Sequence, residues 1–415
     1  MGNIRFRSAV VPLRRGGAVV KPRRVPVAVM VERQRPADPV HCLRPAVLAA
    51  AASRFVRDFP GDVLYAVKCN PEPAVLRALH GGGIRHFDAA SPAEIRAVRQ
   101  LFPQASVHYM HPVKARRDIR MAYADYGVRD FSLDSREELD KILEETGNAA
   151  DLGLIVRLAL PKGSAVYDLS GKFGAPFEEA VDLLRAARAH GARAGLCFHV
   201  GSQCLDPEAY VRALALAGRV IDAAGVGIDV LDIGGGFPVS YPGETPPPID
   251  AFFAAIARGV AALNLPAHCR LWCEPGRALV APGVSLVVQV LKRRGNELFI
   301  NDGIYGSLSD AGVPGFRFPT RMIRPDRPSG AQDQPFVLFG PTCDSADRMA
   351  GPFLLPGDIG PGDWIELGQL GAYGSALRTA FNGFDRAEMV EVSDAPLLET
   401  PGYGPQGVAL EERVA

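Results

Sequence analysis

The chain has 415 residues, and 47% of them are hydrophobic. A sequence of this length and apolar content is typical of a folded protein with a large buried core, which excludes a disordered chain. The 46 basic residues (Lys and Arg) balance the 46 acidic ones, so no net positive charge draws the protein to nucleic acid or to an anionic membrane. We expect neither as a partner.

The seven cysteines are scattered along the chain and form no Cys-X-X-Cys pair. Such a pattern predicts reduced thiols and no zinc site, as is usual in the cytoplasm. No apolar run reaches the roughly 20 residues that span a bilayer. We therefore expect a cytoplasmic protein with no bound metal and no membrane segment.

Short β-rich runs alternate with helical stretches between residues 43 and 280, the pattern of repeated βα units. Helical periodicity covers 43–58, 71–81, 92–101, 115–126, 136–147, 177–190, 207–224 and 250–263. The strand candidates are 63–67, 85–89, 106–109, 130–133, 154–158, 196–200, 230–233 and 270–273. Eight parallel strands with intervening helices predict an α/β fold built on a closed (β/α)₈ barrel. An open doubly wound sheet is the alternative.

After residue 280 the pattern changes to strands without long helices, separated by Gly and Pro turns. The strand candidates are 284–290, 297–300, 335–339, 363–367 and 388–392. They predict a C-terminal all-β domain, either a β-sandwich or an open β-barrel, which an N-terminal strand at 25–31 joins. The segment 311–334 is expected to be a surface loop. The resulting division is an N-terminal segment 1–40, a barrel 41–280, a β domain 281–393 and a loosely ordered tail 394–415.

Polar residues gather where the predicted barrel strands end, which is where (β/α)₈ barrels carry their active sites. They come from six different strands. A core alone would not concentrate such groups on one rim. The residues are Lys68, Asp88, Arg157, His199 with Ser202, Gly234 to Gly236, and Glu274 with Arg277.

The glycine triplet 234–236 follows the seventh predicted strand, and Arg277 follows the eighth. Loops at these two places bind phosphate in many barrels, because glycine lets main-chain N–H groups approach the oxygens closely. A tight turn is the other explanation for the triplet. The neighbouring Arg277 favours phosphate.

Lys68 ends an apolar strand at the same rim. It could be a lysine that merely extends to solvent, or an amine that forms a Schiff base near a phosphate site. A phosphate site with a Schiff-base lysine indicates pyridoxal phosphate. Glu274 could then keep the pyridine nitrogen protonated. His199 could be a core histidine or could stack on the ring, with Ser202 reaching the phosphate.

The chain resembles the fold-type III, alanine-racemase-like family of pyridoxal-phosphate-dependent decarboxylases, in particular its ornithine and lysine decarboxylases. The matching words occur in family order from about 40 to 385, which makes chance resemblance negligible. They are Tyr65-Ala-Val-Lys-Cys-Asn70, Phe87-Asp-Ala-Ala-Ser91, His199-Val-Gly-Ser202, Asp232-Ile-Gly-Gly-Gly-Phe-Pro238, Glu274-Pro-Gly-Arg277, Asn301-Asp-Gly-Ile-Tyr-Gly306, Gly340-Pro-Thr-Cys-Asp344, Gly371-Ala-Tyr373 and Phe381-Asn-Gly-Phe384.

The resemblance implies a role for each rim residue. Lys68 would hold the cofactor as a Schiff base, Glu274 would pair with the ring nitrogen and His199 would stack on the ring. Asp88 and Arg157 would lie near Lys68 and the cofactor hydroxyl. The residues that would hold the phosphate are Ser202, Gly235, Gly236, Arg277 and Tyr373, and Gly234 and Gly276 complete the cofactor-binding set.

The resemblance also implies a homodimer with shared active sites, in which Cys343 and Asp344 reach the barrel of the other copy. Loss of CO₂ would leave a carbanion delocalised into the cofactor ring, and Cys343 would protonate it. Asp344, Tyr305 and Asp310 would bind the substrate. The stretch after Gly306 lacks the Tyr-Asp pair typical of ornithine decarboxylases, so Asp310 is the candidate replacement for its acid.

These features predict decarboxylation of a basic amino acid, with L-ornithine first, which would yield putrescine for polyamine biosynthesis. L-lysine is second, and carboxynorspermidine or another basic amino acid is third. The word Cys343-Asp344-Ser345 differs from the Cys-Glu-Ser of diaminopimelate decarboxylases. A racemase would carry Arg in place of Glu274. A non-catalytic, cofactor-binding regulatory protein is the remaining alternative, although such homologues typically lose residues that this chain keeps.

Overall fold

The computed structural model describes residues 4–6, 24–163, 165–166 and 171–404. The chain divides into two compact units. The barrel unit comprises residues 49–238 and 246–278, and the β unit comprises residues 1–48, 239–245 and 279–415. Of the described helices, none is both long and apolar enough to cross a membrane.

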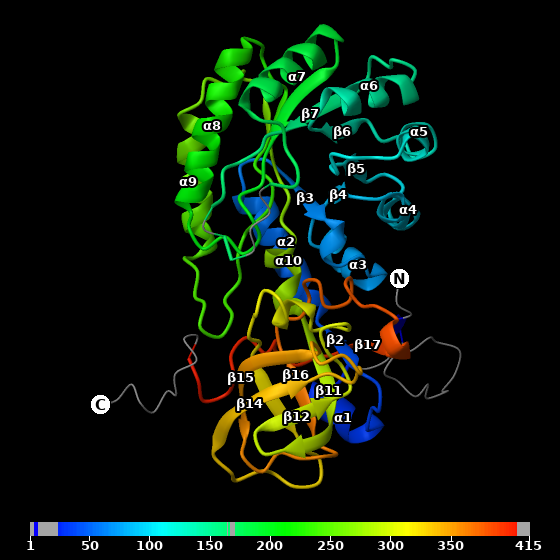
Figure 1. Cartoon of the computed structure of the whole chain (residues 1–415), viewed down its shortest axis with the longest axis vertical. Coiled ribbons are helices and arrows are strands. Elements are labelled where there is room, and N and C mark those ends of the chain that lie inside the picture. The colour runs from blue at the N-terminus through cyan, green and yellow to red at the C-terminus, as the bar shows by residue number, and fades with distance from the viewer. Residues whose placement is uncertain (1–3, 7–23, 164, 167–170, 405–415) are drawn as a thin grey trace, which may run out of the picture. The chain divides into compact units, whose positions relative to one another are not determined.

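All eight predicted barrel strands are present and close into a parallel barrel in the order β10-β3-β4-β5-β6-β7-β8-β9 (Figure 1). The closed barrel is confirmed and the open sheet is excluded. Both faces of a parallel sheet are covered, so its strands are almost continuously buried. The strands are β3 (Asp62–Ala66), β4 (His86–Ala89), β5 (Ser106–Tyr109), β6 (Asp130–Leu133), β7 (Gly153–Arg157), β8 (Arg193–Cys197), β9 (Val230–Asp232) and β10 (Arg270–Cys273).

Helices follow the strands and lie on the outer side of the barrel in Figure 1. Two of them begin at a capping serine, since Ser91 and Ser135 each accept a hydrogen bond from the main-chain N–H three residues later. The helices are α2 (Pro45–Asp58), α3 (Pro73–Gly81), α4 (Pro92–Leu101), α5 (Arg116–Ala124), α6 (Arg136–Glu145), α7 (Phe177–Ala189), α8 (Glu208–Ala224) and α9 (Ile249–Ala261).

The β unit is built on a mixed sheet with the strand path β1-β17-β2-β11-β12-β14-β15, and β16 joins β11 to β13. All five strands predicted after residue 280 are present. The strands are β1 (Ile4–Phe6), β2 (Val40–Leu43), β11 (Val284–Arg294), β12 (Glu297–Ile300), β13 (Thr320–Ile323), β14 (Asp333–Phe339), β15 (Arg348–Pro356), β16 (Trp364–Leu367) and β17 (Ala387–Glu391).

The strand predicted at 25–31 is wrong. These residues form α1 (Val27–Gln34), and Val25 makes only a single parallel bridge to Val392. The run of β-branched residues favours a strand, but Val27, Met30 and Val31 also lie at helical spacing and are buried together. The strands that join this end of the chain to the sheet are β1 and β2.

Two predicted irregular segments are more ordered than expected. The segment 311–334, predicted as a surface loop, contains β13, which pairs with β16. The tail predicted at 394–415 packs on the β unit over its first residues, where Leu397 and Thr400 are buried. Residues 405–415 of that predicted tail lie outside the described residues. Both segments gain order from partners distant in sequence, which local composition does not reveal.

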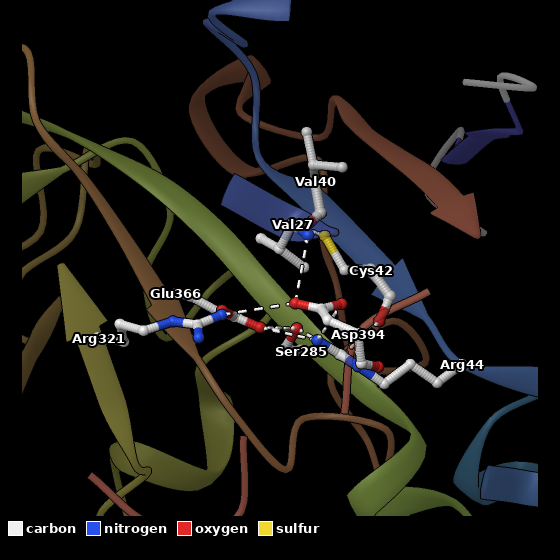
Figure 2. A network of polar contacts seen from close by, with 8 residues as sticks. All are labelled: Val27, Val40, Cys42, Arg44, Ser285, Arg321, Glu366 and Asp394. Carbon is white, nitrogen blue, oxygen red and sulfur yellow. Dashed lines mark hydrogen bonds and ion pairs between the residues drawn. The ribbon is translucent and has the colours of Figure 1, made fainter. Parts of the chain in front are cut away.

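Figure 2 shows a buried network of charged groups in the β unit. Glu366 on β16 has a side chain that is 0% exposed. Its carboxylate accepts hydrogen bonds from the Ser285 hydroxyl at 2.6 Å and from Arg44 Nη2 at 3.0 Å, and Arg321 also donates to it. A buried carboxylate needs several donors to offset its lost hydration. Glu366 therefore ties β2, β11, β13 and β16 together.

Asp394 extends the same network to the tail and to α1 (Figure 2). Its side chain accepts from Arg44 Nη2 at 3.2 Å and from the main-chain N–H of Val27 at 3.2 Å. The first N–H groups of a helix have no partner within the helix. Asp394 supplies one for α1, which explains how a helix starts at a residue with no capping side chain of its own.

We expect Glu366→Ala to destabilise the β unit by about 3–5 kcal/mol, because the buried Arg44 guanidinium and the Ser285 hydroxyl lose this acceptor, as does the partly exposed Arg321. Urea unfolding followed by the fluorescence of Trp364, in a Trp272→Phe background, measures this unit. The control is Asp326→Ala, which removes an exposed pair with Arg35 and should cost less than about 1 kcal/mol. Equal effects of the two variants would contradict the role given to Glu366.

Candidate active site

Lys68 and Asp88 form an ion pair at the carboxyl ends of two neighbouring strands. Lys68 lies in the short helix Val67–Cys69 that directly follows β3, and Asp88 lies on β4. The Lys68 Nζ atom is 3.0 Å from Asp88 Oδ2. The Lys68 side chain is 44% exposed, whereas that of Asp88 is 2% exposed. The amine is therefore held in place and remains accessible to a reactant.

Glu274 and Asp232 bring a second pair of charges to the same end of the barrel. Glu274 directly follows β10, and Asp232 is the last residue of β9. Both side chains are buried. Asp232 Oδ1 accepts a hydrogen bond from the Gly234 N–H at 2.8 Å. Glu274 Oε1 and Asp232 Oδ2 meet no hydrogen-bond donor among the described residues.

Burial shifts the titration of both acids toward the neutral form. It raises the pKa of Asp232 to about 6, against the opposing hydrogen bond from Gly234. It raises the pKa of Glu274 well above its ordinary value, and the nearby acids Asp232 and Asp88 add to the effect. The two carboxyl groups thus share a position that favours a cationic or N–H donor partner.

His199 lies two residues beyond the end of β8, in the loop that follows this strand. The strand predicted at 196–200 therefore ends earlier, at Cys197. Its Nδ1 accepts a hydrogen bond from the Gly201 N–H at 3.0 Å. Burial lowers the pKa of His199 well below its ordinary value, and the cations Arg157 and Lys68 lower it further. The ring is therefore neutral near pH 7, with its proton on Nε2 because Nδ1 acts as acceptor.

The glycine triplet packs directly against the end of β8. Gly234 and Gly236 have φ values of 69° and 102°, a region that favours glycine. A Cβ atom on Gly234 would lie 2.1 Å from the Phe198 carbonyl oxygen, and one on Gly235 would lie 2.5 Å from that of Glu274. No larger residue fits at either position.

The three carbonyl groups of the triplet are all hydrogen-bonded. The carbonyl groups of Gly234, Gly235 and Gly236 accept from Glu274 N–H, the Tyr210 hydroxyl and Cys204 N–H, respectively. Within the described part of the chain, the N–H groups of Gly235 and Gly236 have no acceptor. Two adjacent main-chain donors of this kind suit an anion such as phosphate.

Arg277 and Gly276 complete the loop after β10. Arg277 is buried at the start of α10 (Arg277–Val280). A Cβ on Gly276 would lie 3.0 Å from Cys69 Cβ, so this loop packs closely on the short helix that carries Lys68. The contact between Gly276 and Cys69 places the loop that carries Glu274 and Arg277 next to the short helix that carries Lys68.

The predicted substrate residues belong to the β unit. Cys343 and Asp344 lie on the turn between β14 and β15. The Tyr305 hydroxyl donates to Asp344 Oδ2 at 2.5 Å, which lowers the pKa of Asp344. Asp310 lies in a short 3₁₀ turn (Ser309–Ala311), and Tyr373 follows β16 with a φ of 59°. Tyr305 and Asp344 are thus brought together as one polar pair.

Residues 46–281 match the family model described as the pyridoxal-binding domain of the pyridoxal-dependent decarboxylases. This match spans more than half of the chain and covers the strands that carry the rim residues. The chain belongs to this family. It is therefore a pyridoxal-phosphate-dependent decarboxylase, and its relatives belong to the ornithine, lysine and arginine decarboxylase group.

Several relatives align over most of their length. The chain is 37% identical to a lysine/ornithine decarboxylase of Selenomonas ruminantium over 343 residues, which cover 80% of this chain and 84% of that protein. It is 33% identical to the ornithine decarboxylase of Schizosaccharomyces pombe, covering 81% and 78% of the two chains. The structure of a Vibrio vulnificus lysine/ornithine decarboxylase with cadaverine matches with a TM-score of 0.76 at 34% identity, covering 89% and 98%.

The rim of this decarboxylase fits pyridoxal phosphate on three independent features. The amine of Lys68 is accessible and can react with the aldehyde. The N–H groups of Gly235 and Gly236 can receive the phosphate, and the buried Glu274 Oε1 can accept from a protonated ring nitrogen. An acid that the fold leaves without a donor is understandable when the cofactor supplies one.

The barrel unit brings together most of the predicted cofactor residues, and Tyr373 lies in the β unit. Asp232 begins one of the motifs that match the family, but it is not among the site residues predicted from the sequence. Its position at the end of β9, where an apolar run closes on an acid, could have identified it.

We expect the contribution of Asp232 to the stability of the cofactor-free protein to fall as the pH rises from about 4 to about 6. The folded protein keeps a proton on Asp232 that the unfolded chain releases, so this contribution is present at low pH and is lost through the raised pKa of about 6. The loss amounts to roughly 2–3 kcal/mol. Denaturant unfolding followed by Trp272 fluorescence, in a Trp364→Phe background, measures it.

Asp232→Asn should remove this share of the pH dependence and stabilise the cofactor-free protein at pH 7.5. The control is Asp130→Asn at the opposite end of the barrel, because hydrogen bonds from His108 and Arg193 outweigh burial there and lower the pKa of Asp130. That control should keep the wild-type slope between pH 4 and 6. Parallel curves for wild type and Asp232→Asn would refute the assignment.

Proposed function

We propose that this enzyme decarboxylates a basic amino acid, with L-ornithine as the first candidate and putrescine as its product. The observation that carries the proposal is the turn of the β unit that holds a thiol and a carboxylate side by side. Cys343 is exposed and Asp344 is oriented by the Tyr305 hydroxyl. A proton donor and an anion for a distal ammonium group are the two functions that such a substrate requires.

Pyridoxal phosphate, when bound, supplies an aldehyde that condenses with amines and a ring that accepts the electron pair left by departing CO₂. The residues that would hold it are Lys68 at the aldehyde, Glu274 at the ring nitrogen and His199 against the ring face. Ser202, the triplet 234–236, Gly276, Arg277 and Tyr373 would surround the phosphate.

The amine of Lys68 can reach a bound aldehyde because it is accessible, and Asp88 holds its Nζ atom at 3.0 Å. Arg157 adds positive charge near Glu274 and His199. The neutral His199 can lie against an electron-poor ring without charge repulsion.

Glu274 would help the cofactor ring to stabilise a carbanion, which a racemase with arginine at this position does less. A buried carboxylate beside a ring nitrogen stabilises the protonated nitrogen, and a protonated ring attracts electrons most strongly. The racemase alternative has an arginine at this position, which would favour an unprotonated nitrogen. The retention of Glu274, Lys68 and Arg277 also argues against a non-catalytic regulatory protein.

Cys343 is the proposed proton donor to the substrate carbon. The family resemblance implies that Cys343 and Asp344 complete the barrel site of a second copy of the chain, so we propose a homodimer with shared sites. Asp344 would then attract the distal ammonium group of the substrate, and Tyr305 would fix its orientation. Asp310 is the candidate for a second acid at the distal end.

Lysine is the second candidate, because one methylene separates it from ornithine and hydrophobic contacts discriminate such differences weakly. Proteins named lysine/ornithine decarboxylase are among the relatives, and the solved Vibrio vulnificus structures carry cadaverine or putrescine. An arginine decarboxylase with agmatine bound is 29% identical, with a TM-score of 0.75. Carboxynorspermidine remains a third candidate.

The decisive test incubates the protein and pyridoxal phosphate with L-ornithine, L-lysine, L-arginine and carboxynorspermidine, and measures released CO₂ and the amine. We expect the highest kcat/KM for L-ornithine and the next highest for L-lysine. Lys68→Ala should abolish amine formation, because it removes the amine that would hold the aldehyde of the cofactor. A preference for L-lysine would overturn ornithine alone, and no amine from any substrate would overturn the function.

The shared site has a separate test with mixed dimers. Lys68→Ala and Cys343→Ala should each be strongly impaired, and mixing them should restore partial activity. Each hybrid dimer contains one site with an intact lysine from one chain and an intact cysteine from the other. The control mixes Lys68→Ala with Glu274→Ala, which share one barrel and should not complement. No recovery despite demonstrated subunit exchange would contradict the shared site.

A further inference from the structure

The turn that carries Cys343 and Asp344 is organised around one buried side chain, Asp347. The Asp347 carboxylate is 2% exposed. Its Oδ1 accepts from the Ile304 N–H at 2.8 Å, and its Oδ2 accepts from the Thr342 hydroxyl at 2.7 Å and the Thr342 N–H at 3.2 Å. Asp347 thus holds two segments about forty residues apart in sequence.

The main chain of Asp347 also closes its own turn. The Gly340 N–H donates to the Asp347 carbonyl at 2.9 Å, and the Asp347 N–H donates to the Asp344 carbonyl at 3.0 Å. The carboxylate approaches two glycines so closely that a Cβ on Gly303 would lie 2.1 Å from Oδ1, and one on Gly340 would lie 2.2 Å from either oxygen. These glycines are required by contact with the acid.

The two segments joined by Asp347 are the ones that carry the acting groups. Ile304 precedes Tyr305, whose hydroxyl reaches Asp344 at 2.5 Å. Thr342 precedes Cys343, whose N–H donates to Asn382 Oδ1 at 3.1 Å. Asn382 has a φ of 52° and lies in the segment that also donates from Thr379 to the Tyr305 carbonyl. The carboxylate therefore fixes where Tyr305 and Asp344 meet.

We propose that Asp347 is a positioning residue that sets the geometry of Cys343 and Asp344 for proton transfer and for binding of the distal ammonium group. Asp347 touches neither group with its side chain and acts through the main chain on each side of it. The inference rests on the proposed function for the roles of Cys343 and Asp344. It adds the residue that controls both of them.

The physical reason is the loss of acceptors in a buried site. Removing the carboxylate leaves the N–H groups of Ile304 and Thr342 and the Thr342 hydroxyl without their partner, and each must find water or move. Either outcome shifts the turn. A displacement of about 1 Å at a reacting group can lower a rate by roughly 100-fold.

The first measurement is amide hydrogen exchange of the cofactor-free protein, which does not depend on activity. Asp347→Ala should speed exchange in peptides that cover 302–307 and 340–347, at least tenfold at Ile304 and Thr342, while β11 keeps wild-type protection. The control is Asp363→Ala. Asp363 is a similarly buried carboxylate, at 7% exposed, whose partners are Arg324 and the Gly360 N–H. It should lower stability and leave the turn protected.

The second measurement is steady-state kinetics of the loaded enzyme. Asp347→Ala should lower kcat/KM by roughly 10- to 100-fold through both a lower kcat and a higher KM, because Cys343 and Asp344 move together. Asp363→Ala should keep wild-type kcat and KM for its folded fraction. A purely structural role for Asp347 would make the two variants alike.

Milder variants serve if Asp347→Ala does not fold. Thr342→Val removes only the hydroxyl donor and should lower kcat/KM roughly threefold to tenfold, whereas Thr342→Ser keeps the donor and should remain near wild type. Gly340→Ala places a methyl group against the carboxylate and should raise exchange in the same two peptides. Equal kinetics for Thr342→Val and Thr342→Ser would overturn the inference.

The results separate this inference from the proposed function. If Cys343→Ala and Asp344→Ala are impaired but Asp347→Ala has wild-type kinetics, the positioning role is wrong and the proposed function stands. If Asp347→Ala loosens the turn and lowers kcat/KM while Cys343→Ala and Asp344→Ala behave as wild type, the roles given to those two residues are wrong, and the inference that Asp347 acts through them falls with those roles. Unchanged exchange in Asp347→Ala overturns the inference outright.

Discussion

The buried carboxyl pair of Glu274 and Asp232 is the constraint on which the rest of the active site depends. The closed barrel brings both acids to the carboxyl ends of β9 and β10, where burial opposes their ionisation. A fold tolerates such a pair when a partner relieves it, and Glu274 Oε1 has no donor within the described residues. The family's cofactor brings a ring nitrogen that can carry the missing proton. Lys68, the glycine triplet and Arg277 then have consistent positions, because a molecule held at the ring nitrogen must also be held at its aldehyde and phosphate ends.

The sequence identifies the barrel well because the signals that define it are local. Each strand is a short apolar run, and each following helix has its own periodicity. The features it misses depend on distant partners. Asp394 provides the acceptor for the first N–H of α1, more than 360 residues away, so the run at 25–31 has the composition of a strand but folds as a helix. β15 contains the pair Gly351-Pro352, which is typical of turns, but it lies at the end of the strand path, where proline is tolerated.

The same distinction applies to the candidate site. Lys68, His199 and Glu274 can be recognised because each stands at the end of a strand whose register is evident. Asp347 cannot be recognised in this way, because its role comes from Ile304 and Thr342, which reach its carboxylate only in the folded β unit. The division has a consequence for specificity. Cofactor chemistry is common to relatives named for ornithine, lysine and arginine. We propose that side-chain length is recognised in the β unit, near Asp344, Tyr305 and Asp310.

The β unit uses one physical device at two places. Glu366 and Asp347 are both buried carboxylates that collect donors from segments far apart in the sequence, and neither lies on a surface where water could replace those donors. A carboxylate accepts several hydrogen bonds at once, so it can fix the relative positions of strands or turns that share little apolar contact. The cost of leaving a buried donor unpaired then makes the arrangement close to all-or-none. For Glu366 the consequence is the integrity of the sheet, and for Asp347 it is, in the positioning role proposed above, the placement of the exposed Cys343 and the partly buried Asp344. A turn of this kind needs such an anchor, because its more exposed residues have little packing of their own to hold them.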